Sequence, residues 1–144
     1  MPRVEILHGV NLDQLGRRDP GHYGSLTLAG LEARIIVFAA ELGLEATCFQ
    51  PNAEHAYVAR LHAARGAVDG LVLNPGAWTH YAWAIHDALE IAGVPAVEVH
   101  LSKIQEREAF RRTSVVGDLC LATVSGEGPD GYRTALERLA VALA

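Results

Sequence analysis

The sequence predicts an α/β fold in which helices cover both faces of a parallel sheet. Five short apolar runs, rich in β-branched residues, alternate with helical stretches at residues 4–7, 46–49, 70–74, 95–99 and 119–124. Parallel strands joined through helices make right-handed crossovers, which place helices on both faces of the sheet. We therefore expect a flavodoxin-like three-layer sandwich with a five-stranded parallel sheet in the order 2-1-3-4-5.

The helix expected between the first two runs has the clearest periodicity. Apolar residues recur there at steps of three and four, namely Leu28, Leu31, Ile35, Phe38 and Leu42. This spacing places them on one face of an amphipathic helix. Gly43 follows, at the position where a left-handed residue commonly ends a helix.

Apolar residues at helical spacing predict further helices at 54–65, at 79–92 and near the C-terminus. The residues expected to face the sheet are Val58, Leu61, Ala82, Ile85, Leu89, Ala92, Leu136, Leu139 and Leu143. Gly93 is the expected cap of the helix at 79–92. A short turn at 105–112 is expected before the fifth strand.

Length and composition set the broad class of protein. The chain has 144 residues, which fits one domain spanning 1–144, because two cores and a linker need more sequence. Half of the residues are hydrophobic and 20% are charged, which excludes disordered and low-complexity classes. A net charge of -5 without any Lys/Arg-rich stretch argues against nucleic acid and membranes as partners. A small-molecule substrate is favoured.

The start of the chain and its cysteines favour a reducing, cytoplasmic location. The first apolar run begins at Val4, which leaves no room for a secretory signal peptide. Charged residues or histidines interrupt every stretch that approaches the roughly 20 apolar residues of a membrane span. Cys48 and Cys120 belong to no CxxC pair and fall on opposite edges of the predicted sheet, so both are expected to be reduced.

Polar residues gather after the first, third and fourth apolar runs. Ligands of parallel α/β folds bind beyond the carboxyl ends of the strands, so these positions indicate the site. They are Asn11, Arg17, Arg18, Tyr23, Asn74, His80, Asp87, Glu98, His100 and Ser102. The segment 11–25 is longer than the about two to six residues of an ordinary βα connection, which is typical of a lid.

Simpler interpretations exist for these features taken singly. A solvated loop explains the long segment, and an isolated histidine is more often structural than functional. HxH and HExxH spacings are missing from the sequence, so a metal site is disfavoured. No GxGxxG follows the first apolar run, and GxxxxGK[ST] is missing from the sequence, so the phosphate cradles of dinucleotide-binding and P-loop proteins are not predicted. The Gly-rich SGEGPDG at 125–131 could seat an anion at the start of the last helix, but a turn with Asp130 near the helix cap explains it more simply. The convergence of cations, imidazoles, amides and a phenol on one edge still favours an active site.

Four blocks of the sequence resemble the signature segments of type II 3-dehydroquinate dehydratases. The blocks are HGVNLDQLGRRDPGHYGSLTL, LVLNPGAWTHYAWAIHDAL, PAVEVHLS and EREAFRRTS, in the family's order and spacing. The resemblance implies a homo-oligomer, commonly a dodecamer built as a tetramer of trimers. It also implies that the chain converts 3-dehydroquinate to 3-dehydroshikimate and water, in the shikimate or quinate pathway. The reaction of that family is an anti elimination through an enolate, and it uses no metal or organic cofactor.

The resemblance implies a role for each matching residue. Tyr23 would be the base, Arg18 the arginine beside it, His100 the proton donor and Asn11 the residue that positions a water on the enolate. The substrate ligands would be Asn74, His80, Asp87, Leu101, Ser102 and Arg111, with Glu98 and Arg107 as supporting charges.

The chemistry of these groups agrees with such an elimination. A phenol has an ordinary pKa of about 10, so it needs a nearby cation to ionise near neutral pH. Arg18 and Tyr23 share one segment of the chain. The departing hydroxyl needs a proton, and an imidazolium at His100, favoured by Glu98, is a suitable donor.

Two alternatives remain open at this point. The family usually begins its first motif Asn-Gly-Pro-Asn, whereas this chain has His8-Gly9-Val10-Asn11, so a diverged paralogue with another substrate or without catalysis is conceivable. Lys103, the single lysine of the chain, is a possible Schiff-base nucleophile. Retention of Arg18, Tyr23, His100 and Arg111 together favours the dehydratase.

Overall fold

The computed structural model describes residues 1–17, 21 and 25–144. The strands are β1 (Arg3–His8), β2 (Glu45–Phe49), β3 (Gly70–Asn74), β4 (Ala96–His100) and β5 (Thr123–Ser125). They form one parallel sheet in the order β2-β1-β3-β4-β5. The predicted fold class and strand order are therefore confirmed.

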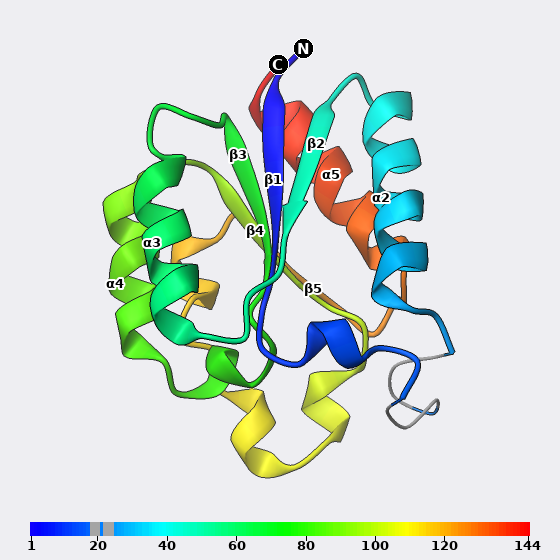
Figure 1. Ribbon diagram of the computed structural model, residues 1–144, viewed down its shortest axis with the longest axis vertical. Coiled ribbons are helices and arrows are strands. Elements are labelled where there is room, and N and C mark those ends of the chain that lie inside the picture. The colour runs from blue at the N-terminus through cyan, green and yellow to red at the C-terminus, as the bar shows by residue number, and fades with distance from the viewer. Residues whose placement is uncertain (18–20, 22–24) are drawn as a thin grey trace.

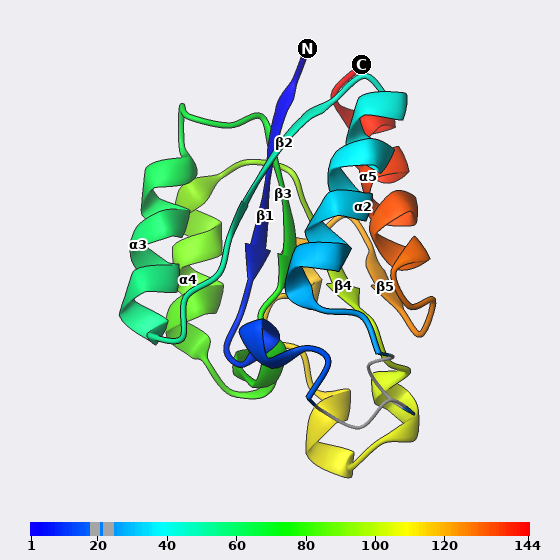
Figure 2. The ribbon, with the colours of Figure 1, turned by 45° about the vertical axis from the view of Figure 1, so that its right-hand side comes forward.

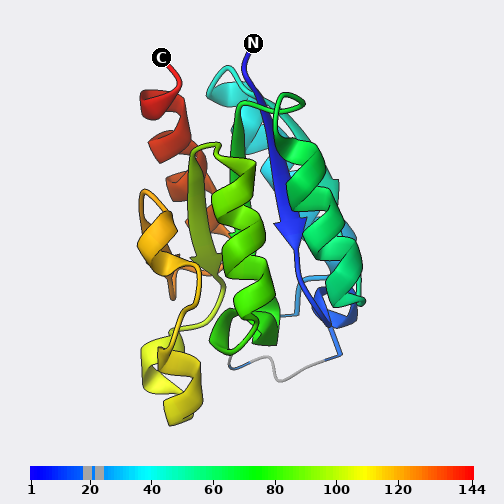
Figure 3. The same ribbon diagram turned by 90° about the vertical axis from the view of Figure 1, so that its left-hand side faces the viewer.

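Helices cover both faces of this sheet, as Figures 1 and 3 show. The α-helices of the described residues are α2 (Leu28–Glu41), α3 (Glu54–Ala64), α4 (Trp83–Ala92) and α5 (Asp130–Ala142). One face carries α2 and α5, and the other carries α3 and α4. Short 3-10 turns complete the described chain: η1 (Leu12–Gln14), η2 (Gly76–His80), η3 (Ile104–Glu106), η4 (Ala109–Arg112) and η5 (Gly117–Leu119).

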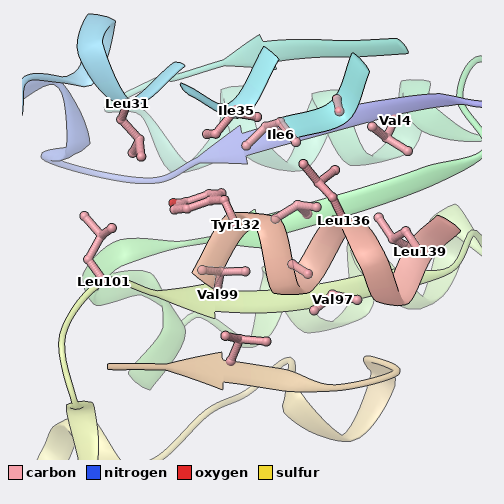
Figure 4. Close-up of a cluster of buried hydrophobic side chains, with 14 of the residues drawn as sticks. Val4, Ile6, Leu31, Ile35, Val97, Val99, Leu101, Tyr132, Leu136 and Leu139 are labelled. Carbon is pink, nitrogen blue, oxygen red and sulfur yellow. The ribbon is translucent and has the colours of Figure 1, made fainter. Parts of the chain in front are cut away.

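The alternation of side chains along the strands divides the core into two clusters. Val4 and Ile6 of β1 point toward α2 and α5, whereas Leu7 points toward α3 and α4. Figure 4 shows the first cluster, in which Tyr132 and Leu136 of α5 pack over the sheet. The predicted inward faces of α2, α4 and α5 all contact these clusters.

The helix caps form where glycine was expected. Gly43 and Gly93 have φ values of 75° and 65°, in the left-handed region that favours glycine. At the start of α2, the Thr27 hydroxyl accepts a hydrogen bond of 3.1 Å from the backbone N–H of Gly30. These local signals explain why the bounds of α2 agree with the sequence pattern.

Two predicted bounds differ from the structure by several residues, and so does the residue of α3 that was expected to be most buried. The fifth strand begins at Thr123 rather than 119, because the chain first makes the turn η5. The helix predicted at 79–92 begins at Trp83, since residues 76–80 form the turn η2. In α3, Tyr57 is fully buried and Val58 only partly, because the Tyr57 hydroxyl has a partner inside, the Leu7 carbonyl at 3.0 Å.

Two further expectations concern cysteines and membrane spans. Cys48 and Cys120 are both free thiols, as the strand order required. In the described part of the chain, no helix has the length and apolar character needed to cross a membrane.

Candidate active site

A cavity of about 140 Å³ lies at the carboxyl ends of β1, β3 and β4. Figure 2 shows η1, η3 and η4 gathered beyond this end of the sheet. The predicted site residues that line the cavity are Asn11, Asn74, His80, His100, Leu101, Ser102, Arg107 and Arg111. The structure thus brings together side chains from three separate segments of the chain.

His100 is held at the end of β4 by a buried carboxylate. Glu98 lies two residues earlier on the same face of the strand, and its Oε2 is 2.5 Å from Nε2 of His100. The other oxygen, Oε1, accepts hydrogen bonds from the hydroxyls of Ser114 at 2.8 Å and Thr123 at 3.2 Å. Because both Glu98 oxygens are hydrogen-bonded, the carboxylate is held in place, and its contact with Nε2 fixes the orientation of the His100 ring.

Glu98 is ionised although its side chain is fully buried. Burial by itself raises its pKa, but the hydrogen bond and positive charge of His100 and the hydroxyls of Ser114 and Thr123 outweigh that effect. The pKa of Glu98 therefore lies below its ordinary value. The buried anion gives a protonated His100 its counter-charge.

His80 stands next to His100 at the cavity. The two rings stack with centroids 6.5 Å apart and planes inclined by 21°. Nδ1 of His80 donates to the Thr113 carbonyl at 2.7 Å, because a carbonyl oxygen can only accept. Burial, together with the charges of His100 and Arg111, lowers the pKa of His80, so its ring is neutral near pH 7. Nε2 of a neutral His80 is consequently an acceptor for a substrate hydroxyl.

Asn11 is held in a backbone conformation that few residues adopt. Its φ is 68° and its ψ is 2°, and it is the one residue other than glycine with positive φ in the described chain. Its N–H donates to Oδ1 of Asn52 at 2.9 Å, and Nδ2 of Asn52 donates to Asp13 at 3.0 Å. Gln50 donates to the Gly9 carbonyl at 3.0 Å. The segment after β2 therefore fixes the turn that carries Asn11.

Two glycines allow the loops after β1 and β3 to touch. A Cβ on Gly9 would lie 2.0 Å from the carbonyl oxygen of Pro75, and one on Gly76 would lie 2.7 Å from that of Val10. The close approach permits the hydrogen bond of 2.7 Å from Gly9 N to the Asn74 carbonyl. This contact joins the two loops that carry the amide side chains of the cavity.

Asn74 ends β3 with an oriented amide. Its Oδ1 accepts from the N–H of Gly76 at 3.2 Å, and its Nδ2 donates to the Tyr132 hydroxyl at 3.4 Å. An amide has two donor hydrogens and two acceptor lone pairs, so one of each is left for a ligand.

Two arginines make the remaining wall cationic. Nε of Arg111 donates to Glu108 at 3.1 Å, and its guanidinium lies 4.7 Å from the ring centroid of Phe110. Nε of Arg107 lies 3.7 Å from the same carboxylate. Arg107 and Arg111 thus bring guanidinium groups to the cavity wall that Ser102 also lines, which suits a ligand with oxygen acceptors.

Four predicted residues are not among those that the structure places at this cavity. Arg18 and Tyr23 lie outside the described residues. Asp87 is exposed on α4 and pairs with His86 at 3.0 Å, so it lies outside the cavity of this chain. Arg17 is also exposed, and donates to Gln14 at 3.3 Å.

Lys103 does not line the cavity either. Its side chain is exposed, with its stem beside Gly126. A nucleophilic lysine needs desolvation to lose its proton, and this lysine lacks it. The Schiff-base alternative is therefore disfavoured.

The sequence reasoning missed the groups that position the site. Gln50 and Asn52 follow the second apolar run, and their polar character after a strand was the available signal. No sequence signal marked Ser114 and Thr123, because Glu98, the partner that they share, is distant in sequence. Ile104 supplies apolar wall after β4.

The arrangement suits proton transfer on a small polar anion. An imidazole backed by a carboxylate can give up a proton, a neutral imidazole and two amides can bind hydroxyls, and two guanidiniums can donate to oxygen atoms of a ligand. Within the described residues, the one cluster of His, Cys and acidic side chains with metal-ligand spacing lies elsewhere, at His8, Glu32 and Cys48.

Known proteins resemble the chain in both sequence and structure. The profile of the family described as "Dehydroquinase class II" matches residues 2–140. A 3-dehydroquinate dehydratase of Syntrophotalea carbinolica is 50% identical over 137 residues, 94% of this chain and 93% of the relative. One of Desulforudis audaxviator is 49% identical over 141 residues, covering 98% and 93%. The crystal structure of the type II dehydroquinase of Propionibacterium acnes superposes with a TM-score of 0.93 at 41% identity, covering 98% and 97% of the chains.

Proposed function

The chain belongs to the class II dehydroquinase family, and we propose that the cavity at the carboxyl edge of its sheet is where it dehydrates 3-dehydroquinate. It is a hydro-lyase that forms 3-dehydroshikimate and water. The observation that carries the assignment of the site is His100 at the cavity wall, hydrogen-bonded at 2.5 Å to a buried, ionised Glu98.

We assign proton donation to His100. In the elimination a proton leaves the carbon beside the ketone, and the hydroxyl on the next carbon departs as water once it is protonated. The Glu98 carboxylate stabilises the protonated ring before transfer, and the fixed ring orientation keeps the donor aimed at one leaving group. This arrangement supports His100 as the acid of the reaction.

The base is Tyr23, with Arg18 as the cation that favours its ionised form. Both residues belong to the segment that resembles the family's first motif, and in that family this segment supplies the group that removes the first proton. A phenolate beside a guanidinium meets this need near neutral pH. As the family resemblance implies, the proposed reaction uses neither metal nor organic cofactor.

The remaining cavity residues hold the substrate and its enolate. The amide of Asn11 positions a water on the enolate oxygen, where negative charge develops. Asn74, His80 and Arg111 bind hydroxyls, while Ser102 and the backbone of Leu101 bind the carboxylate, with Arg107 in support. The oriented Asn74 amide and the neutral His80 ring support these assignments. Asp87 remains a predicted ligand that this single chain does not place at the cavity.

The assembly and location follow as proposals. Residues 1–144 act as one domain in a cytoplasmic homo-oligomer, commonly a dodecamer in this family, that serves aromatic biosynthesis or quinate catabolism. Exposed aromatic rings of Tyr81, Trp83 and Phe110 support an interface between subunits, because large apolar groups on a surface favour association.

An absorbance assay of the conjugated enone product tests the proposal. We expect turnover of 3-dehydroquinate by the purified chain, and a loss of kcat by at least about 10²-fold in His100→Gln. Lys103→Ala is the matched control and should keep its turnover, because this side chain is exposed outside the cavity. A chain that binds but never turns over 3-dehydroquinate would instead be a diverged paralogue.

A further inference from the structure

Three side chains of metal-binding type meet between β1, β2 and α2, outside the catalytic cavity. They are His8 at the end of β1, Cys48 in β2 and Glu32 in α2. One ligand atom from each lies within 4.8 Å of the other two. The strand register explains the meeting: Ile6 pairs with Cys48, and His8 lies two residues further on the same face, under α2.

His8 has the features of a ligand without its ion. Its side chain is fully buried, and neither ring nitrogen makes a hydrogen bond within the described part of the chain. Nε2 lies 3.1 Å from Oε2 of Glu32, which is ion-pair distance, but the contact lacks hydrogen-bond geometry. Buried polar groups almost always have a partner. We therefore expect Nε2 of His8 to have a partner at the point where the three ligand atoms approach one another.

We propose that His8, Glu32 and Cys48 form a binding site for one thiophilic divalent cation of the zinc type. Imidazole, carboxylate and thiolate are the ligands that such cations take. Tetrahedral coordination with ordinary zinc bond lengths separates ligand atoms by about 3.3–3.6 Å. The His8–Glu32 separation of 3.1 Å is already close to this value, and the 4.8 Å limit of the cluster needs only small rotations of side chains.

The charges of the site balance on binding. Burial lowers the pKa of His8 to about 4, so its imidazole is neutral and available as a ligand. Burial and the neighbouring Glu32 raise the pKa of Cys48 to about 12, so the free site holds a thiol. Binding forms a metal–sulfur bond and releases the thiol proton to solvent. Thiolate and carboxylate together then neutralise the double charge of the cation.

Access and position give the site a structural role. The Glu32 side chain is 32% exposed, which opens a path for the cation and for a water as fourth ligand. Gly9 follows His8 directly and Gln50 lies two residues after Cys48, and the Gln50 amide donates a hydrogen bond of 3.0 Å to the Gly9 carbonyl. A bound cation ties the ends of β1 and β2 to α2 and thereby stabilises the turn that carries Asn11.

The test uses the reduced, metal-stripped full chain in its native assembly. Titration with Zn²⁺ in a calorimeter, in buffers of different ionisation enthalpy, should show one equivalent per chain and release of one proton. Titration with Cd²⁺ should produce an ultraviolet charge-transfer band for one thiolate. Saturating Zn²⁺ should raise the Tm by about 5 °C or more when it exceeds the Kd by 100-fold.

Cys120→Ser is the matched control, because Cys120 is the other half-buried free thiol of the chain. Cys48→Ser should abolish the Cd²⁺ band, and Glu32→Gln should weaken Zn²⁺ binding at least tenfold, while Cys120→Ser should change neither. Glu32→Gln preserves shape at a part-exposed position and thus separates loss of a ligand from loss of folding.

Three results would overturn the proposal. They are absence of a Cd²⁺ band in the wild-type chain, loss of that band in Cys120→Ser rather than Cys48→Ser, and Zn²⁺ affinity unchanged by Glu32→Gln. The last result would show that the cation binds without Glu32. None of these measurements depends on turnover, so they remain decisive whatever the enzyme assay shows.

Discussion

Gly9→Ala should disable the catalytic cavity although it adds a single methyl group. That group would lie 2.0 Å from the carbonyl oxygen of Pro75 and 2.6 Å from its Cα, where ordinary contact begins at 3.4 Å. Both colliding partners are backbone, so no side-chain rotation relieves the clash. The loops after β1 and β3 must therefore separate by on the order of 1 Å, a misplacement that costs roughly 10²-fold in rate.

The same separation should lower stability. Overpacking of this kind costs about 1–3 kcal/mol, and the movement also strains the hydrogen bond of 2.7 Å from Gly9 N to the Asn74 carbonyl. We expect kcat to fall about 10²-fold and the urea midpoint to fall with it. Steady-state assays of the conjugated enone and urea unfolding followed by circular dichroism measure the two effects.

Gly43→Ala separates the effect on the site from general destabilisation. Gly43 has φ of 75° and no atom within 4 Å of an added Cβ, and it caps α2 at the opposite end of the sheet. Alanine there costs about 1 kcal/mol in left-handed strain and should leave kcat unchanged. Wild-type kcat and urea midpoint in Gly9→Ala would refute the argument that this contact holds the site.

Further predictions concern the proton transfers. Tyr23→Phe should lower kcat by about 10²-fold or more with little change in KM; near-normal turnover would assign the base elsewhere. Arg18→Ala should regain activity at alkaline pH, where the phenol ionises without help, whereas Arg17→Ala should show no such rescue; identical pH profiles would remove Arg18 from the mechanism. The pKa of Glu98 is lower in the folded chain than in the unfolded chain, so the ionised side chain stabilises the fold. This contribution is complete above the pKa of an unfolded glutamate, about 4.3, and is lost as the pH falls through the pKa of Glu98 in the folded chain. In Glu98→Gln, the midpoint of urea unfolding should therefore depend less on pH at acid pH than it does in the wild-type chain. An unchanged dependence would show that Glu98 is not ionised.

The parts of the fold that the sequence predicted are those that neighbouring residues determine. Helix α2 was predicted from apolar residues at helical spacing, and Gly43 marked its end because glycine adopts positive φ without strain. The strand order followed from the alternation of strands and helices together with the handedness of crossovers. The helix rule depends only on residues within a few helical turns of one another. The crossover rule applies to every βα unit, whatever its sequence.

The local rules failed where a contact between distant segments decided the conformation. The sequence around 119–122 looks like a continuous strand, yet the chain turns at η5, where the N–H of Gly117 donates to the Ser114 hydroxyl at 3.0 Å. That hydroxyl donates in turn to Glu98. A buried charge on β4 thus influences where β5 begins, and no pattern within the fifth apolar run reports it.

The candidate site divides in the same way. The sequence determined which residues follow β1, β3 and β4, and parallel strands place those residues at one edge whatever the details of packing. Tertiary structure alone decided that Asn11 takes a left-handed conformation with its N–H bonded to Asn52, and that Asp87 lies outside the cavity of this chain. It also decided that His8 meets Cys48 and Glu32. The reason is physical: chain order fixes the end of the sheet at which a side chain emerges, whereas its partners come from segments brought close only when the two core layers pack.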